Sequence, residues 1–265
     1  DREKVIRALE DAHAQASAIA RHGIRIPSGE GPSRLPNVTA ELSFAKGWFE
    51  VQDEGSQIVA DLVMAAEGEQ VLDYCAGGGG KTLALSATMA NKGQVHAYDS
   101  DRKRLAPIIE RLRRAGTRNV QVHDNEKSLK PLVDKFDRVL VDAPCTGTGT
   151  WRRRPDTKWR LTEKNLQERI EQQRGALEKA SAYVRPGGML CYVTCSVLPE
   201  ENQDQIAAFV AANANFELVS ALDGWQTLFG GQAVQPYSPD GLSLTLTPAR
   251  TDTDGFYFAM LKKKA

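Results

Sequence analysis

The chain has 265 residues, of which 41% are hydrophobic and 26% are charged, as expected for a folded protein with a sizeable core. Lys and Arg together number 34, as do Asp and Glu, so the formal net charge is +0. That balance excludes a polybasic tail protein but leaves room for a basic patch on one face. No apolar run approaches the roughly 18 residues that span a bilayer, and residues 1–22 lack the apolar block of a signal peptide.

The 4 cysteines are too few and too dispersed for a disulfide framework, so we expect a cytoplasmic protein with no membrane segment. The chain begins with Asp1 rather than Met, so we expect it to be a fragment.

The first residues differ in pattern from the rest of the chain. Apolar residues recur at three- or four-residue spacing over residues 1–22, which predicts a helix that Gly23 would end. Residues 27–47 are rich in Pro and Gly and indicate a loop or linker with at most short strands.

From about residue 53 onward, helix-like and strand-like segments alternate. A helix is indicated around residues 58–63, and an apolar run over 70–75 leads into a cluster of glycines. The other predicted strands are 94–98, 119–123, 136–141 and 189–194, and the other predicted helices are 80–91, 102–115, 163–184 and 200–213. This alternation predicts an α/β fold with a parallel, doubly wound sheet. The apolar tail 255–262 predicts an additional antiparallel edge strand.

Ligands bind such sheets outside the carboxyl ends of the strands. The residues expected there are polar, glycine-rich or cysteine-bearing: 73–81, Asp99, Asp124, 142–148 and 194–201.

The glycine loop after the first main strand has the sequence AGGGGKT over residues 76–82. A Walker A loop would require Gly where Cys75 lies, and a dinucleotide fingerprint would require Gly where Thr82 lies. Asp99 lies 20 residues after Gly79, where a carboxylate accepts hydrogen bonds from ribose hydroxyls, and Asp124 could accept one from an adenine amine. Together with Asp142, these features suit a phosphate-free nucleoside with a positive centre, namely S-adenosylmethionine.

A simpler interpretation is that Asp99 and Asp124 only cap the helices that follow them. A nucleotide hydrolase using the lysine of Gly80-Lys81-Thr82 is a further alternative.

Two cysteines are expected in the same crevice. Cys145 follows the fourth main strand in DAPCTGTG (142–149), and Cys195 follows the fifth in TCS (194–196). A lone cysteine is usually a small buried hydrophobe, which fits Cys191 in mid-strand. Cys195 fits that interpretation poorly, because it lies at a strand end close before a helix, where a thiolate can be stabilised. The cysteine spacings and the 4 dispersed histidines do not indicate a metal site, so we expect no metal.

A thiolate beside a methyl donor indicates one reaction. Carbon 5 of a pyrimidine is a poor nucleophile, and a thiolate that adds to carbon 6 makes carbon 5 able to attack the methyl sulfonium. This is covalent catalysis, after which a base removes the carbon-5 proton and the thiol leaves. The chemistry alone leaves open which of the two cysteines attacks.

Six ordered motifs carry a resemblance to a known family. They are VQDEGSQ (51–57), DxCAxxGGKT (73–82), DAPC (142–145), RRRPDxKWR (152–160), TCSVxxxEN (194–202) and TDGF (253–256). Together they resemble the NOP/Sun-type RNA cytosine-carbon-5 methyltransferases, and among them the bacterial ribosomal RNA (RsmB-like) branch. The resemblance covers about residues 47–262 and implies a Rossmann-like S-adenosylmethionine-dependent methyltransferase fold.

The resemblance also implies residue roles. Cys195 would be the nucleophile, Cys145 would assist product release, and Asp142 would contact the cytosine edge near the methyl donor. DNA cytosine methyltransferases use the cysteine of Pro-Cys instead, and here the Thr-Cys-Ser match selects Cys195. The expected S-adenosylmethionine contacts are Cys75, Ala76, Gly77, Gly78, Gly79, Gly80, Lys81, Asp99, Asp124 and Asp142.

The chain departs from the family at a few positions. Gly77-Gly78 replaces the usual Ala-Pro, and Gly55 replaces a common Ala. Bacterial members usually have a helical RNA-binding domain and a complete small α/β subdomain upstream. We therefore assign residues 1–46 to a partial, truncated N-terminal α/β subdomain with its linker, and 47–265 to the catalytic domain.

A basic segment follows Cys145. Arg152, Arg153, Arg154, Lys158 and Arg160 lie within nine residues, with Trp151 and Trp159 interleaved. Cations can neutralise phosphates and indoles can stack on unpaired bases, so we expect RNA contacts there rather than a merely solvated loop with Trp159 buried. The target cytosine must leave its stack, which favours a loop or an opened stem of RNA. A second basic run, 102–118, is interpreted as the solvated face of a helix.

The sequence thus predicts a monomeric enzyme that makes 5-methylcytosine in ribosomal RNA, most specifically in the small subunit. One alternative keeps the chemistry and changes the substrate to transfer RNA. Another is a non-catalytic RNA-binding or ribosome-assembly factor that has kept the fold.

Overall fold

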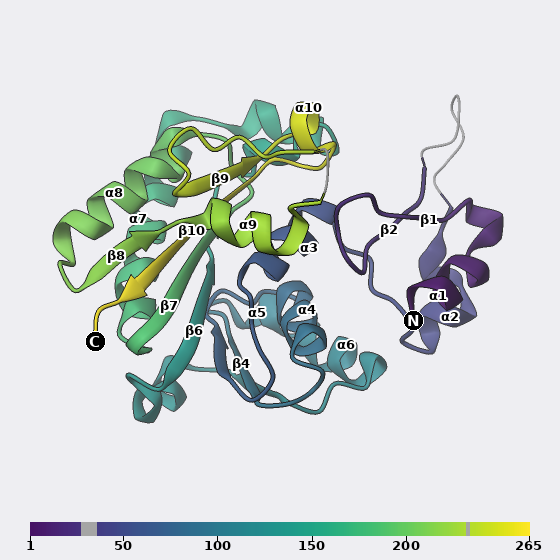
Figure 1. Cartoon of the computed structure of the whole chain (residues 1–265), viewed down its shortest axis with the longest axis horizontal. Helices are drawn as coiled ribbons and strands as arrows, with labels where there is room; N and C mark the ends of the chain where they lie inside the picture. Colours follow the sequence, from purple (N-terminus) through teal and green to yellow (C-terminus); the bar gives the residue numbers. More distant parts are fainter. Residues whose placement is uncertain (28–35, 232–233) are drawn as a thin grey trace.

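The computed structural model describes residues 1–27, 36–231 and 234–265. Figure 1 shows a small N-terminal unit beside a larger α/β body. The N-terminal unit consists of helix α1 (Arg2–Ala8), a 3-10 helix (Glu10–Ala12), the antiparallel pair β1 (Gln15–Ala16) and β2 (Ile24–Arg25), a second 3-10 helix (Val38–Ala40) and helix α2 (Leu42–Ala45). Of the predicted 27–47 loop, residues 28–35 lie outside the described part.

The predicted helix over residues 1–22 is wrong beyond Ala8. The chain leaves the helix at Leu9, and His13 takes a left-handed backbone conformation with φ 52°. Val5 and Leu9 belong to a small core within the N-terminal unit, whereas Ile19 is buried in the core of the larger body. The regular apolar spacing therefore came from two packing surfaces rather than from one helical face.

The larger body is built on an eight-stranded sheet in the order β5-β4-β3-β6-β7-β10-β8, with β9 also paired to β10. Five strands are parallel, as predicted: β3 (Gln70–Asp73), β4 (Gln94–Tyr98), β5 (Val120–His123), β6 (Phe136–Asp142) and β7 (Val184–Thr194). The order reverses between β3 and β6, which makes the sheet doubly wound and confirms the predicted Rossmann-like class.

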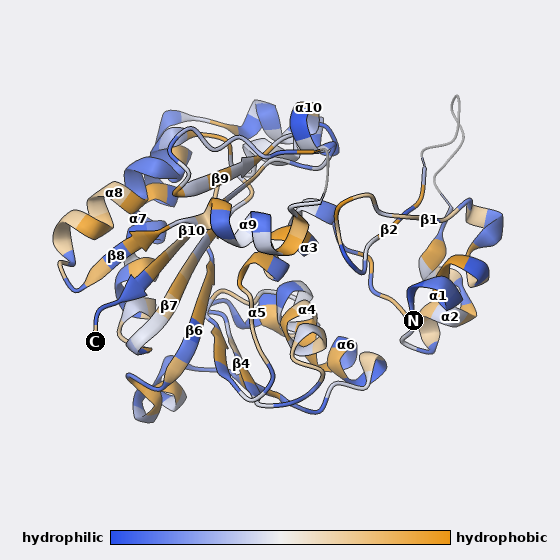
Figure 2. Cartoon of the chain, viewed as in Figure 1, coloured by the Kyte–Doolittle hydropathy of each residue, from blue (hydrophilic) through white to orange (hydrophobic). Residues whose placement is uncertain are grey.

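Helices cover both faces of this sheet. Buried residues of α3 (Glu54–Leu62), α4 (Gly80–Thr88) and α9 (Ala221–Phe229) share one core cluster with the sheet, and those of α7 (Glu163–Ser181) and α8 (Gln203–Ala212) share another. The short helices α5 (Arg102–Leu105) and α6 (Ile108–Ala115) follow β4. Figure 2 shows the hydrophobic residues concentrated along the strands, whereas α10 and the end of β10 are hydrophilic.

The C-terminal tail forms β10 (Phe256–Lys263), which is antiparallel as predicted but is not an edge strand. It lies between β7 and β8 (Phe216–Val219) and also pairs with β9 (Ser243–Leu246), and the short helix α10 (Pro248–Thr251) precedes it. All of residues 256–261 are buried, so both faces of the strand are covered. Such a strand is typical of the interior of a sheet, where neighbours on both sides also satisfy its backbone N–H and C=O groups.

Among the residues that the structure describes, no helix is both long and apolar enough to cross a membrane.

A buried histidine pair between β4 and β5 gives a prediction about stability. His96 is 6% exposed, its Nδ1 lies 2.8 Å from Nε2 of His123, and burial lowers the pKa of His96 from 6.5 to about 4. The unfolded chain therefore takes up a proton below pH 6.5 that the native protein resists until about pH 4, and native stability falls as pH drops through that window.

We expect His96→Asn to remove about 2 kcal/mol of the loss in unfolding free energy between pH 7.5 and pH 5. Urea denaturation of both proteins at the two pH values measures this. His13→Asn is the matched control, because His13 is exposed and Asn tolerates its left-handed backbone. An equal pH dependence for wild type and His96→Asn would contradict the prediction.

Candidate active site at the carboxyl edge of the sheet

The carboxyl ends of four neighbouring parallel strands place polar and thiol groups along one edge of the sheet. Asp73 ends β3, Asp99 follows β4, Asp142 ends β6 and Cys195 follows β7. A cavity of about 430 Å³ opens at this edge. It is lined by Gln52, Asp53, Ser56, Lys81, Asp142, Cys145, Thr146, Gly147, Thr150, Arg153, Arg154, Thr157, Cys195 and Phe256.

The two predicted cysteines meet in this cavity. Sγ of Cys145 lies 3.3 Å from Sγ of Cys195, and both are free thiols. They are brought together because β6 and β7 are adjacent parallel strands whose ends lie at the same level. Cys191 is buried within β7, as its mid-strand position predicted.

The surroundings of the two thiols are not equivalent. The hydrogen bond from Cys145 lowers the pKa of Cys195, and the Lys81 ammonium lowers it further, against the opposing effects of burial and Asp142. The pKa of Cys145 is raised by the same hydrogen bond, by burial and by the Glu201 carboxylate. The thiolate is therefore favoured on Cys195, with Cys145 as its protonated donor.

Lys81 and Asp142 form the charged pair of the site. Nζ of Lys81 lies 2.7 Å from Oδ2 of Asp142, and the same ammonium lies 5.3 Å from the ring centre of Phe256. Both residues are on the cavity wall beside Cys195. Since the Lys81 side chain is almost fully buried and already paired, the nucleotide-hydrolase alternative is left without a free lysine for phosphate.

Residues that the sequence analysis did not single out hold the cysteine loops. The fully buried Glu201 accepts hydrogen bonds from the backbone N–H of Thr146, 2.8 Å away, and from Gln173 Nε2, 2.9 Å away. Asn202 accepts a bond from the Thr194 hydroxyl at 2.6 Å and donates one to the Ser196 carbonyl at 3.0 Å. Glu201 and Asn202 close the TCSVxxxEN motif, and their position in it was the available signal.

The glycine loop lies beside two carboxylates. The backbone N–H of Gly77 donates to Asp99 at 2.9 Å, and Gly79 has φ 81° and no room for a Cβ, which would lie 2.4 Å from Ile108. Asp73 is fully buried and accepts a bond from Thr82, and burial raises its pKa to about 7. Its other oxygen, Oδ1, has no hydrogen-bond partner among the described residues. A cationic ligand group would satisfy that oxygen, so the site fits the predicted cofactor. Asp73 was predicted at a strand end but not as a cofactor contact.

Asp99 and Asp124 are not the caps of the helices that follow them. Asp101 caps α5 through the N–H of Lys103, and Asn125 caps the 3-10 helix after β5 through the N–H of Ser128. The side chain of Asp124 is 72% exposed and lies 3.8 Å from Arg102. The exposed Asp124 carboxylate is therefore free to meet a ligand, whereas Asp99 is buried and its two oxygens accept bonds from the N–H groups of Gly77 and Asp101.

The structure divides the predicted RNA-binding residues. Arg153 and Arg154 line the cavity, whereas Arg152 lies outside it and donates to the buried Asp254 at 2.7 Å. Trp159 is 83% exposed and Lys158 lies 5.9 Å from its ring centre, so the interpretation in which Trp159 is buried is wrong. Arg160 is exposed and pairs with Asp156 at 3.0 Å.

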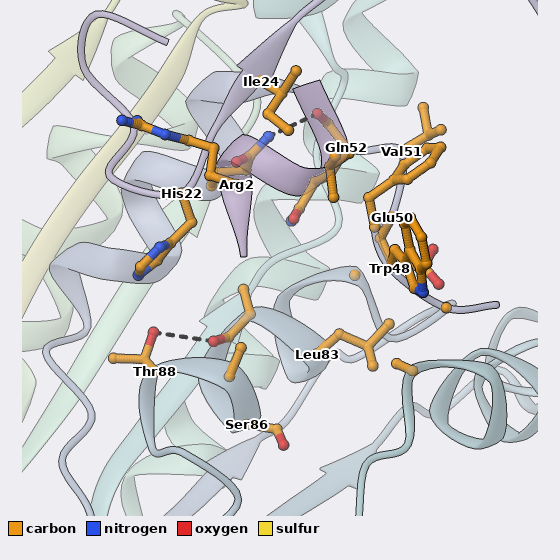
Figure 3. A pocket seen from close by; sticks show the side chains of 18 of the residues that line it. Arg2, His22, Ile24, Trp48, Glu50, Val51, Gln52, Leu83, Ser86 and Thr88 are labelled. Carbon is orange, nitrogen blue, oxygen red and sulfur yellow. Dashed lines mark hydrogen bonds between the residues drawn. The ribbon is translucent and has the colours of Figure 1, made fainter. Parts of the chain in front are cut away.

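A second cavity, of about 560 Å³, separates the N-terminal unit from α4. Figure 3 shows Arg2, His22 and Ile24 above Leu83 and Thr88 of α4. Trp48, Glu50, Val51 and Gln52, in the segment between α2 and α3, close it on one side (Figure 3). Gln52 also lines the first cavity, but neither cysteine reaches this one.

No group of three or more His, Cys, Asp or Glu residues able to hold a metal ion occurs within residues 1–27, 36–231 and 234–265.

The unequal thiols predict an order of alkylation. Because its pKa is lowered, Cys195 should react with iodoacetamide at neutral pH before Cys145 and Cys75, whose pKa values are raised, and before the buried Cys191, whose pKa burial raises to about 12. Cys145→Ala removes the hydrogen-bond donor and should slow the labelling of Cys195 at pH 7. The labelling rates of Cys195 in the variant and in the wild type should become more alike at higher pH. Peptide mapping by mass spectrometry measures both. Earlier labelling of Cys145 in the wild-type chain would contradict the assignment.

Comparison with known proteins gives consistent results. Residues 60–262 match the family described as 16S rRNA methyltransferase RsmB/F. The chain is 36% identical over 260 residues to "Ribosomal RNA small subunit methyltransferase B" of Erwinia tasmaniensis, a match that covers 97% of this chain and 56% of the relative. The chain spans 54% to 58% of the length of such curated relatives.

Solved structures with similar folds include two from Pyrococcus horikoshii. A methyltransferase homologue superimposes with a TM-score of 0.78 at 27% identity, covering 99% of this chain and 83% of the other. NSun6, determined with SFG, has a TM-score of 0.74 at 28% identity and covers 87% of this chain and 57% of the other.

Proposed function

Since this chain belongs to the family of 16S rRNA methyltransferases RsmB/F, we propose that it transfers a methyl group from S-adenosylmethionine to carbon 5 of a cytosine in small-subunit ribosomal RNA. The observation that carries the proposal is the pair of free thiols, Cys145 and Cys195, 3.3 Å apart in a cavity that also holds Lys81 and Asp142. We propose that the catalytic domain spans 47–265 and that 1–46 is part of a further subdomain.

The cofactor contacts are proposed at the glycine loop and the strand ends. Asp99 would accept hydrogen bonds from the ribose and Asp124 one from the adenine amine. The free oxygen of Asp73 adds a place for the amino group of the methionine moiety. The NSun6 structure with SFG, an S-adenosylmethionine analogue, supports a cofactor of this class. When bound, S-adenosylmethionine supplies a methyl group on a sulfonium.

We propose that Cys195 is the nucleophile. Its thiolate adds to carbon 6 of the cytosine, which makes carbon 5 nucleophilic. Carbon 5 would then attack the methyl carbon of the sulfonium, whose methyl–sulfur bond breaks to leave S-adenosylhomocysteine. A base finally removes the carbon-5 proton, and its electron pair restores the double bond between carbons 5 and 6 and expels the Cys195 thiolate. Asp142, beside the thiolate and paired with Lys81, contacts the cytosine edge. The lowered pKa of Cys195 supports this role, because more of the thiol is ionised at neutral pH.

We assign the release step to Cys145. Its raised pKa has as its largest cause the hydrogen bond to Cys195. Once Cys195 is bonded covalently to carbon 6, its sulfur no longer carries the negative charge that the hydrogen bond from Cys145 stabilises. The Cys145 thiol is then released from this hydrogen bond and can take part in proton transfer.

RNA contacts are proposed at the segment after Cys145. Arg153 and Arg154 line the cavity, and Lys158, Arg160 and the exposed Trp159 continue from it over the surface. Cations beside an exposed indole suit a single-stranded segment whose bases are unstacked. Arg152 is paired with carboxylates and lies outside the cavity, so its role in RNA binding would be to hold the segment in place rather than to contact the RNA.

The test is transfer from radiolabelled S-adenosylmethionine to small-subunit ribosomal RNA taken from a strain without the modification, with nucleosides identified by mass spectrometry. We expect 5-methylcytidine. Labelling of transfer RNA alone would show that transfer RNA, and not ribosomal RNA, is the substrate. A different methylated nucleoside would reject the carbon-5 chemistry. RNA binding without any transfer would favour the non-catalytic factor.

A further inference from the structure

Asp254 is a fully buried carboxylate with two arginine partners. Its Oδ1 accepts a hydrogen bond from Nε of Arg152 at 2.7 Å. Its Oδ2 accepts two from Arg153, at 2.9 Å from Nε and 2.6 Å from Nη2. A buried charge is stable only when it is paired in this way. Both arginines lie in the basic segment 151–160, and Asp254 lies just before β10, about a hundred residues later in the sequence. The ion pairs therefore connect this segment to the start of β10.

The backbone next to Asp254 is connected directly to the proposed nucleophile. The N–H of Gly255 donates to the carbonyl of Gly149 at 2.8 Å, and the N–H of Gly149 donates to the carbonyl of Cys195 at 2.9 Å. The three segments approach so closely that a Cβ on Gly149 would lie 2.2 Å from the Gly255 carbonyl oxygen. The Asp254 carboxylate is therefore held at a defined distance from Cys195.

The other side of the segment is connected to the N-terminal unit. Arg152 also lies 3.7 Å from Asp53 and 3.9 Å from Asp252. Arg25 of β2 pairs with both Asp252 and Glu54. Arg152 thus pairs with three carboxylates, whereas Arg153, within the described part of the chain, forms a salt bridge with Asp254 only and lines the cavity.

Arg153 keeps binding capacity after pairing with Asp254. A guanidinium has five N–H donors, and the two bonds to Asp254 use one on Nε and one on Nη2. Its side chain is 49% exposed. The remaining N–H groups of Arg153 are therefore free to bind a phosphate at the cavity, while the two bonds to Asp254 fix the orientation of the guanidinium.

We propose that Asp254 is a positioning residue for the RNA substrate: it orients Arg153, and with it the segment 151–160, relative to Cys195. This rests on the proposed function. The role concerns the placing of RNA rather than the chemical step, because Asp254 touches neither cysteine and does not line the cavity.

The first test is Asp254→Asn, which keeps the shape and removes the charge. Arg152 and Arg153 are exposed enough to be hydrated when their partner is lost, so the fold should persist, as thermal denaturation would show. We expect KM for RNA to rise about tenfold or more, as when charge-assisted hydrogen bonds are lost. The kcat at saturating RNA and the Kd for S-adenosylmethionine should stay near wild type. The matched control is Asp134→Asn. Asp134 pairs with Lys263 at 2.7 Å, lines neither cavity and has a left-handed backbone that Asn tolerates, so this variant should leave KM close to wild type.

A double-variant cycle shows whether Asp254 acts through Arg153. If it does, Arg153→Met alone should raise KM for RNA, and Asp254→Asn combined with Arg153→Met should raise it no further. Additive effects of the two substitutions would overturn the proposal. So would an unchanged KM in Asp254→Asn, or a loss confined to kcat or cofactor binding. Absence of methyl transfer in the wild-type chain would instead reject the proposed function, and RNA binding by fluorescence anisotropy would still test Asp254.

Discussion

Replacing Cys195 with alanine should lower the rate of methyl transfer by at least about 10⁴-fold, the scale of loss seen when a covalent nucleophile is removed. The physical reason is that carbon 5 of cytosine becomes reactive only after a nucleophile has added to carbon 6. In this cavity the thiol with the lowered pKa is Cys195. Cys145 should not replace it at neutral pH, because burial and the Glu201 carboxylate still raise the pKa of Cys145 when its hydrogen bond to Cys195 is gone.

The measurement is single-turnover methyl transfer from labelled S-adenosylmethionine at saturating RNA, with the binding of both ligands measured separately. Binding should be retained in Cys195→Ala, because the alanine removes only the sulfur atom. The matched control is Cys191→Ala, since Cys191 lies in the same strand but is buried outside the cavity, and it should keep near-wild-type activity. Substantial transfer by Cys195→Ala would reject the assignment of the nucleophile.

Replacing Cys145 with alanine should instead trap the enzyme on its substrate. If Cys195 attacks and Cys145 assists release, the variant can form the bond to carbon 6 and transfer the methyl group, but it cannot complete elimination. Turnover should therefore fall by at least about 10²-fold, the lower end of what one proton-transfer group contributes, while an RNA-linked protein accumulates.

A denaturing gel of protein incubated with RNA and S-adenosylmethionine tests this directly. A slowly migrating band should appear in Cys145→Ala and be absent from Cys195→Ala and from the double variant. Nuclease treatment should return the band to the position of the free protein. A band in Cys195→Ala but not in Cys145→Ala would exchange the two roles. Free protein alone in the Cys145→Ala lane, with methyl transfer intact, would reject a release function for Cys145.

Much of the fold was predictable because the signals are local. Period and length distinguish the strands and helices between residues 53 and 213, and the glycines after β3 mark a strand-to-helix turn whatever lies around them. The predicted helix over 1–22 failed because periodicity alone does not reveal which core an apolar residue joins. The strands β8 and β9 were not predicted, because they are defined by antiparallel pairing with β10 rather than by a local signal, and α9 was not predicted although it is as long as α4.

The candidate site, too, was predictable only in those features that depend on local sequence. The motifs of the chain by themselves determined the family, the doubly wound sheet and the edge at which Cys145, Cys195 and the aspartates meet, because strand ends in such a sheet share one edge. Only the tertiary structure decided which thiol is the more acidic, since Lys81 and Glu201 lie far from the cysteines that they influence in the sequence. It likewise decided that Arg152 is held by Asp254, about a hundred residues away. Pairing and electrostatic interactions depend on distance in space, which residue spacing along a chain does not specify.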